Sequence, residues 1–158
     1  MKGSYEKWDV GSFKVIIDYG HNPHVLDVLA KVLSALSKGR KISVNSRIGN
    51  RREEDIRVFG KTLTEIYDYI LFKESDPRKR PIGETAKLAE EGILSTGFPQ
   101  KNYCMIQDEG DAADRALSKA RAGDLVVIQT DDVHKVISDV LELKKWYCPK
   151  GKRWRNNT

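Results

Sequence analysis

The stretch FKVIIDYGHNPHVLDVLAKVL, residues 13–33, contains the transition that decides how the chain folds. Its first six residues are rich in β-branched side chains and predict a buried strand that ends on Asp18. From Val25 onward, apolar side chains recur at helical spacing. Asn22 is a good N-cap, and Pro23 suits the first helical position because its missing N–H needs no partner there. The turn DYGHN therefore joins a strand to a helix.

The same alternation continues along the chain. Strands that alternate with helices predict parallel pairing through right-handed crossovers. Only Gly11 and Ser12 separate the first two strands, which predicts an antiparallel hairpin at one edge. We expect an α/β fold: a doubly wound, mostly parallel six-stranded sheet with an antiparallel edge hairpin, Rossmann-like in type. The expected strands are residues 5–10, 13–18, 41–45, 69–73, 103–107 and 124–129, and the expected helices are about 24–37, 53–67, 84–95, 109–121 and 132–145.

Composition limits the class of protein. The 158 residues suit a single domain, and no apolar run is long enough to cross a membrane. Cys104 and Cys148 are far apart and lack a metal-type spacing, which favours reduced thiols in a cytoplasmic protein. The net charge of +5 belongs to residues 144–158, which hold six of the 28 Lys and Arg and no acid. We therefore expect a domain over residues 1–143 and a basic tail over 144–158.

Polar residues follow the carboxyl ends of four expected strands, where ligands gather in open α/β sheets. These segments are residues 18–22, 46–52, 74–80 and 129–132. Arg47, Arg51 and Arg52 precede a helix, where arginine can fork onto a phosphate or a carboxylate. They could equally pair with the acids of the following turn on a solvated face.

The segment after the fourth expected strand is similarly mixed. Glu74, Asp76, Arg78 and Arg80 could together hold a zwitterionic small molecule, with acids on its amine and arginines on its carboxylate. The alternative is an ordinary polar loop. His21 is likewise either a turn residue or part of a site.

Several familiar catalytic signatures are absent from the sequence. No GxxxxGK[ST] phosphate loop and no GxGxxG after a strand occur, and FGKT (59–62) falls inside an expected helix. No Ser or Cys nucleophile is framed by a base, and the histidines lack the spacing of a metal site. From the residues alone we expect a ligand-binding α/β domain with an incomplete active site, without catalytic or metal-binding residues.

The strand that ends in DYGHNP resembles the D-Y-A-H-[NT]-P signature that begins the C-terminal domain of the Mur ligase superfamily, whose members are ATP-dependent amide ligases. The resemblance covers about residues 3–143. Within the superfamily the likeness is greatest to the Mur-like region of cyanophycin synthetase. It is carried by the stretches IGNRREEDIRVFGK (48–61), ILFKESDPRKRPIGETAKLAEEGI (70–93) and AGDLVVIQTDDVHKVI (122–137).

The resemblance implies a role for each matched residue. Asp18, Tyr19, His21 and Asn22 would contact ATP, with Asp18 accepting hydrogen bonds from the ribose hydroxyls. The incoming amino acid, arginine if the cyanophycin likeness holds, would face a second set of side chains. That set is Arg51, Arg52, Glu74, Asp76 and Arg78.

The cofactors implied by the resemblance are ATP and Mg²⁺. The phosphate loop and the magnesium ligands are expected on a central ATPase domain of the same or a companion chain. By itself this chain is therefore expected to be inactive as a carbon–nitrogen ligase.

Three residues depart from the family pattern, and the last of them favours a function other than that of a ligase. Gly20 replaces Ala, Asn50 replaces Asp, and Ser4 stands where the family has an arginine that helps to bind ATP. The alternative is a non-catalytic module that retains the fold and binds a small ligand or a protein. A third interpretation is single-stranded nucleic-acid binding by the basic and aromatic tail; neither nucleic acid nor a membrane is the expected partner.

Overall fold

The computed structural model describes residues 5–18, 25–45, 50–73, 79–106, 109–130 and 133–147. Six strands and five α-helices alternate along these segments. The strands are β1 Tyr5–Val10, β2 Phe13–Asp18, β3 Lys41–Asn45, β4 Tyr69–Lys73, β5 Tyr103–Ile106 and β6 Leu125–Gln129. The helices are α1 Val25–Leu36, α2 Glu53–Ile66, α3 Glu84–Leu94, α4 Glu109–Lys119 and α5 Val133–Tyr147, and a short 3-10 helix spans Gln100–Asn102.

The strands form one sheet in the order β1-β2-β6-β3-β4-β5. β1 pairs antiparallel with β2, with Val10 opposite Phe13 across the two-residue turn. All other neighbours are parallel. The expected fold class is therefore confirmed, including the edge hairpin.

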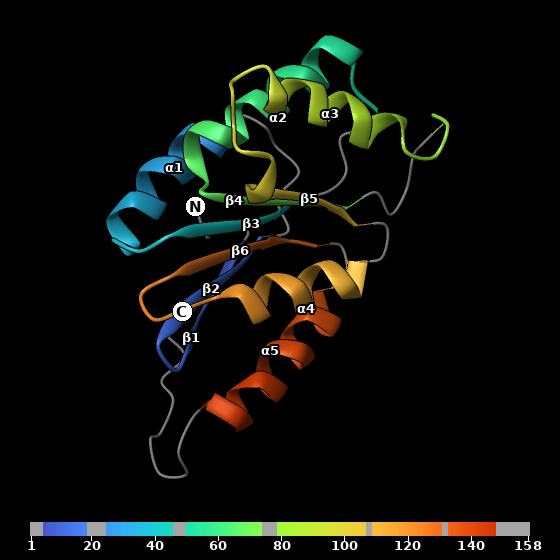
Figure 1. Cartoon of the computed structure of the whole chain (residues 1–158). Coiled ribbons are helices and arrows are strands. Elements are labelled where there is room, and N and C mark those ends of the chain that lie inside the picture. The colour runs from blue at the N-terminus through green and yellow to red at the C-terminus, as the bar shows by residue number, and fades with distance from the viewer. Residues whose placement is uncertain are drawn as a thin grey trace.

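Helices cover both faces of the sheet. α1, α2 and α3 lie on one face, and α4 and α5 lie on the other (Figure 1). Each face has its own apolar layer, because successive side chains of a strand point to opposite sides. The layer under α1–α3 includes Ile16, Leu33, Ile56, Leu63, Ile70 and Val127, and the layer under α4 and α5 includes Val15, Ile17, Val44, Leu71, Ala116 and Val140.

Two glycines let α2 and α3 pack closely. A side chain at Gly60 would collide with the carbonyl oxygen of Ala89, and one at Gly92 would collide with that of Arg57. The two helix backbones are therefore in direct contact. α2 follows β3 and α3 follows β4, so the N-termini of both helices lie toward the carboxyl ends of these strands.

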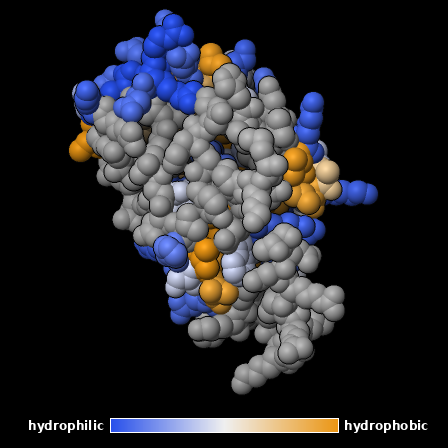
Figure 2. Space-filling view, turned by 180° about the vertical axis from the view of Figure 1, so that it is seen from behind, coloured by the Kyte–Doolittle hydropathy of each residue, from blue (hydrophilic) through white to orange (hydrophobic). Residues whose placement is uncertain are grey.

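Large apolar side chains at the described surface are scattered. Val58, Ile82, Leu94 and Leu141 are exposed. Figure 2 shows hydrophobic side chains only in small separate patches on the face it presents. Such isolated residues are normal for a folded domain. Among the described helices, none has the length and hydropathy that a membrane span requires.

Candidate functional site

Four neighbouring strands end on polar residues at the carboxyl edge of the sheet. Asp18 ends β2, Gln129 ends β6, Asn45 ends β3 and Lys73 ends β4. Asp18, Asn45 and Lys73 are buried, with 6 %, 2 % and 1 % of their surface exposed. Burying polar groups is unfavourable unless they are hydrogen-bonded or paired, so a cluster of them in an apolar sheet marks this edge as special.

The pleat divides these four residues between the two faces. Asp18 and Gln129 are register partners and lie two residues beyond Ile16 and Val127, which belong to the layer under α1–α3. Asn45 lies on that face as well. Lys73 lies two residues beyond Leu71 and therefore faces the α4 and α5 side. The edge thus has a carboxylate and two amides on one face and a lysine on the other.

Asn45 is fixed by two hydrogen bonds. Its Nδ2 donates to Ser43 Oγ at 2.8 Å and to the Leu71 carbonyl oxygen at 3.3 Å. The Thr130 N–H donates to the Asp18 carbonyl oxygen at 3.2 Å, which extends the β2–β6 pairing one residue past β6. These bonds link β3 to β4 and β6 to β2 at the carboxyl edge of the sheet.

The charge of Asp18 affects the pKa of a tyrosine in the adjacent core. Burial raises the pKa of the Tyr67 phenol well above its usual range, and the nearby carboxylate of Asp18 raises it further. Tyr67 directly follows α2 and belongs to the layer under α1–α3. The electrostatic effect of the Asp18 carboxylate therefore reaches the face of the sheet that α2 covers.

The N-termini of α2 and α3 are joined at the same edge by Arg80. This half-buried side chain donates to the Arg51 carbonyl oxygen and to Glu84 Oε1, each at 2.8 Å. Neither helix has a side-chain cap: Arg52 occupies the N-cap of α2, and Gly83, with φ of 89°, that of α3. Their first N–H groups can thus favour a negative charge nearby.

Of the residues expected to face an amino acid, Arg51 and Arg52 are described. Arg52 is 79 % exposed and binds Asp55 through Nε at 3.0 Å and Nη2 at 3.3 Å. The hydrogen bond from Arg52 lowers the pKa of Asp55 below its usual value. The sequence left open whether Arg52 contacts a ligand or pairs with an acid of the following turn. In the structure Arg52 pairs with Asp55. Arg51 is half-buried beside it.

The other expected site residues lie outside the described segments. These are Tyr19, His21, Asn22, Arg47, Glu74, Asp76 and Arg78, and their assignments stay predictions. Within the described segments, no group of three or more His, Cys, Asp or Glu side chains is placed to hold a metal ion.

Sequence reasoning missed three buried polar residues near this edge: Asn45, Lys73 and Thr85. Lys73 is the last residue of the otherwise apolar strand YILFK, and a charged residue at that position could have indicated a site at the strand end. Thr85, in the first turn of α3, gave no signal. Its hydroxyl is buried and has no hydrogen-bond partner among the described residues. A buried donor without a partner at a loop-facing helix end is a candidate ligand contact.

Comparison with known proteins decides the family. The sequence pattern of the family described as "Mur ligase, glutamate ligase domain" matches residues 6–130, well over half of the chain. The chain belongs to this family. Both the resemblance of the DYGHNP turn and the doubly wound fold are confirmed.

Among relatives of this Mur ligase domain, the cyanophycin synthetase of Nostoc sp. is 35 % identical over 136 residues. The match covers 85 % of this chain and 15 % of that protein, so the Mur ligase domain spans a small part of the relatives it matches. A solved UDP-N-acetylmuramoyl-L-alanyl-D-glutamate–2,6-diaminopimelate ligase superposes with a TM-score of 0.76 and 20 % identity, covering 90 % of this chain and 32 % of the other.

A third similar structure is the bifunctional folylpolyglutamate synthase/dihydrofolate synthase of Yersinia pestis, solved with AMPPNP and a Mn ion. The TM-score is 0.62 with 21 % identity, and the superposition covers 90 % of this chain and 31 % of that one. At such identities these two structures support the fold. The chemistry of the site is a separate question.

Proposed function

We propose that this chain is the nucleotide- and amino-acid-binding domain of an ATP-dependent acid–amino acid ligase of the cyanophycin synthetase type. The observation that carries the proposal is the buried polar edge headed by Asp18, at the carboxyl ends of neighbouring parallel strands in a Mur ligase domain. The likeness to cyanophycin synthetase supports the choice within the family.

The residues at this edge fit the sugar end of a nucleotide. An ionised carboxylate only accepts hydrogen bonds, and the ribose 2′ and 3′ hydroxyls are donors. Asp18 is held at the strand end in a largely dry setting, where such a bond is stronger than in water. Asp18 would bind the ribose, and Tyr19, His21 and Asn22 would line the rest of the nucleotide.

The amino acid would bind across the N-termini of α2 and α3. Arg51 and Arg52, together with Arg78, would attract its carboxylate, and the uncapped helix ends would add to that attraction. The exposed pair between Arg52 and Asp55 is weak in water, so Arg52 can exchange Asp55 for a ligand. Glu74 and Asp76 would take the guanidinium if the amino acid is arginine.

ATP supplies the phosphoryl group that activates a substrate carboxylate for attack by an amine. Phosphoryl transfer needs phosphate-binding groups and metal ions to stabilise charge. We assign these, with Mg²⁺, to a central ATPase domain on the same or a companion chain. The residues described above would orient the nucleotide and the amino acid against that domain.

The nucleotide contact can be tested by changing both sides of one hydrogen bond. ATP and 2′,3′-dideoxy-ATP would be titrated, each with Mg²⁺, into the parent and the Asp18→Asn variant, with amide chemical shifts as the readout. We expect the parent to bind ATP several-fold more tightly than the dideoxy analogue, and this ratio to fall toward one in the variant, because a neutral amide oxygen is a weaker acceptor than a carboxylate. Such loss of selectivity is the signature of a direct coupling.

Two controls keep this experiment decisive. The exposed Asp114→Asn variant on α4 carries the same change of charge away from the edge and should keep the parent ratio. The dideoxy comparison in the parent needs no mutation, so misfolding of Asp18→Asn cannot hide the answer. Equal binding of the two nucleotides by the parent would argue against a ribose contact. No binding of either at millimolar concentration would favour the non-catalytic module.

The amino-acid contact has its own test. Arginine, agmatine, which lacks the α-carboxylate, and citrulline, which lacks the side-chain charge, would be titrated in turn. We expect arginine to shift the Arg51, Arg52 and Glu53 amides and both analogues to bind at least several-fold more weakly. Arg51→Ala should reduce the preference for arginine over agmatine but leave that over citrulline unchanged. Equal binding of arginine and citrulline would argue against an arginine-selective site.

A further inference from the structure

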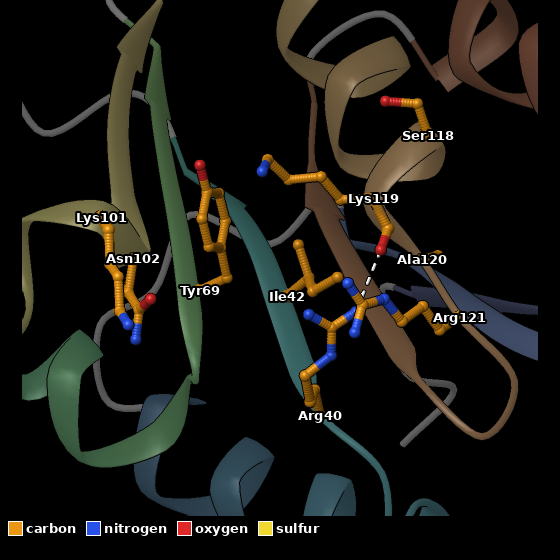
Figure 3. A pocket seen from close by; sticks show the side chains of 9 residues that line it. All are labelled: Arg40, Ile42, Tyr69, Lys101, Asn102, Ser118, Lys119, Ala120 and Arg121. Atoms are coloured by element: carbon orange, nitrogen blue, oxygen red, sulfur yellow. Dashed lines mark hydrogen bonds between the residues drawn. The ribbon is translucent and has the colours of Figure 1, made fainter.

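A second candidate site lies at the opposite edge of the sheet. A pocket of about 420 Å³ opens at the amino ends of β3 and β4, between the end of α4 and the segment before β5 (Figure 3). β3 alone is five residues long, and strands rise about 3.3 Å per residue. The pocket is therefore more than ~10 Å from the polar carboxyl edge. Its lining residues are Arg40, Ile42, Tyr69, Lys101, Asn102, Ser118, Lys119, Ala120 and Arg121.

The lining is cationic and contains no acid. Four of its nine residues are Lys or Arg. Arg40 is paired with Asp124, which is not one of the lining residues. The other three cations are not ion-paired with any carboxylate of the described segments; these are Lys101, Lys119 and Arg121. The pocket therefore holds three positive charges without a counter-charge from that part of the chain.

Two of the cations are held in position by the fold. Arg40 donates to Asp124 Oδ2 at 2.6 Å and to the Lys119 carbonyl oxygen at 3.0 Å, which fixes the end of α4 against β3 (Figure 3). The Lys119 Nζ lies 4.5 Å from the centre of the Tyr69 ring. A cation over an aromatic face is stabilised there. The pocket is thus partly organised before any ligand arrives, and this lowers the entropy cost of binding.

We propose that this pocket binds a small multivalent anion, one that carries two or more carboxylate or phosphate groups. Its volume is within the range of small-molecule sites. Arg121 and Lys101, both exposed, stand on different segments and can contact separate anionic groups. Asn102, next to Lys101, adds a neutral donor, whereas the Ser118 hydroxyl donates to the Arg115 carbonyl oxygen. The site is separate from the nucleotide edge, so its occupant is neither of the substrates assigned there.

The test is an amide-resolved titration of the full chain at 150 mM salt, where weak surface electrostatics are largely screened. Tripolyphosphate and citrate would serve as the phosphate and carboxylate probes, with acetate as the monovalent control. We expect saturable shifts of Tyr69, Asn102, Ser118 and Arg121 with one or both probes, and no saturation with acetate. The probe that binds more tightly identifies the chemical source of the ligand.

The matched variants are Lys101→Ala with Arg121→Ala, and Lys61→Ala with Lys87→Ala. Both pairs remove two exposed positive charges, but Lys61 and Lys87 stand on α2 and α3, away from the pocket. We expect the first pair to weaken binding at least tenfold and the second to change it less than twofold. Equal weakening by both pairs, or shifts confined to residues 144–158, would overturn the proposal and leave general attraction to a basic chain.

Discussion

Arg40 and Asp124 are 84 positions apart in the sequence, yet Arg40 Nη2 lies 2.6 Å from Asp124 Oδ2. Arg40 directly precedes β3 and Asp124 directly precedes β6, its neighbour in the sheet. Asp124 is only 4 % exposed and also accepts from the Arg121 and Arg40 backbone N–H groups, at 2.8 and 3.1 Å. This contact aligns the amino ends of two central strands and closes one wall of the cationic pocket.

This carboxylate should make the fold sensitive to acid. Burial raises the pKa of Asp124, but the Arg40 guanidinium and the two N–H groups outweigh it, and the pKa lies below its usual range. A lowered folded pKa gives stability that is present above the unfolded pKa of about 4 and is lost as pH falls through the folded value. Asp124→Asn should lower the free energy of unfolding by about 1–3 kcal/mol at pH 7 and reduce the further loss toward pH 3.

Urea unfolding of the parent, Asp124→Asn, Arg40→Met and the double variant at both pH values checks this. The double variant should lose less than the sum of the single losses, because the two side chains interact directly. Additive losses would mean that the pair does not stabilise the fold.

Tyr67 should govern stability at alkaline pH. Burial, assisted by Asp18, holds the pKa of this phenol above its ordinary value. In the unfolded chain this phenol ionises near pH 10. The stability from this group is therefore complete below pH 10 and falls as pH rises toward the folded pKa. The Tyr67→Phe variant should lose less stability than the parent between pH 8.5 and 11.

Urea midpoints at pH 8.5, 10 and 11 measure this difference. Tyr103 makes a parallel contribution, because burial and its hydrogen bond to Glu90 raise its pKa to about 12. A variant in which both tyrosines are replaced by Phe should therefore lose still less stability as the pH rises from 8.5 to 11. If the parent and Tyr67→Phe decline in parallel, another group controls the alkaline transition.

The contact between α2 and α3 should not tolerate a methyl group. Gly92→Ala and Gly60→Ala each place a Cβ against a carbonyl oxygen of the facing helix. Overpacking of this kind typically lowers the free energy of unfolding by about 1–3 kcal/mol. Val58→Ala, at an exposed position of α2, should change it by less than about 0.5 kcal/mol. Denaturant unfolding measures all three, and a stabilising Gly92→Ala would contradict the close helix contact.

Arg80 should stabilise the start of both helices. Arg80→Ala leaves the Arg51 carbonyl oxygen and Glu84 without their donor. We expect a loss of about 1–3 kcal/mol and faster hydrogen exchange in the first turns of α2 and α3. The matched control is Arg57→Ala, which removes a more exposed arginine that also links the two helices through Glu91. Its effect should be smaller and should leave exchange at the start of α3 unchanged, because Arg57 pairs with Glu53 in the first turn of α2 but contacts α3 through Glu91, near the end of that helix.

Much of the fold could be predicted from local pattern. The β-branched run before Asp18, the two-residue turn at Gly11 and the helical spacing after each strand act over a few residues, and each expected element is present. Bounds differ by a residue or two at some ends. α5, for example, continues to Tyr147, because the local pattern fixes an element more strongly than its last turn.

The candidate site divides along the same line. The amino-acid pattern shows that polar residues follow the strands and that a DYGHNP turn is present, and it places the chain among Mur ligase domains. The strand order could be known only from the folded chain: β6 lies between β2 and β3, and this makes Asp18, Gln129 and Asn45 neighbours. The burial of Lys73 and the ion pair between Arg40 and Asp124 likewise exist only in the folded chain. Periodicity and turn chemistry are local, whereas burial and ion pairing depend on which distant strands share the sheet.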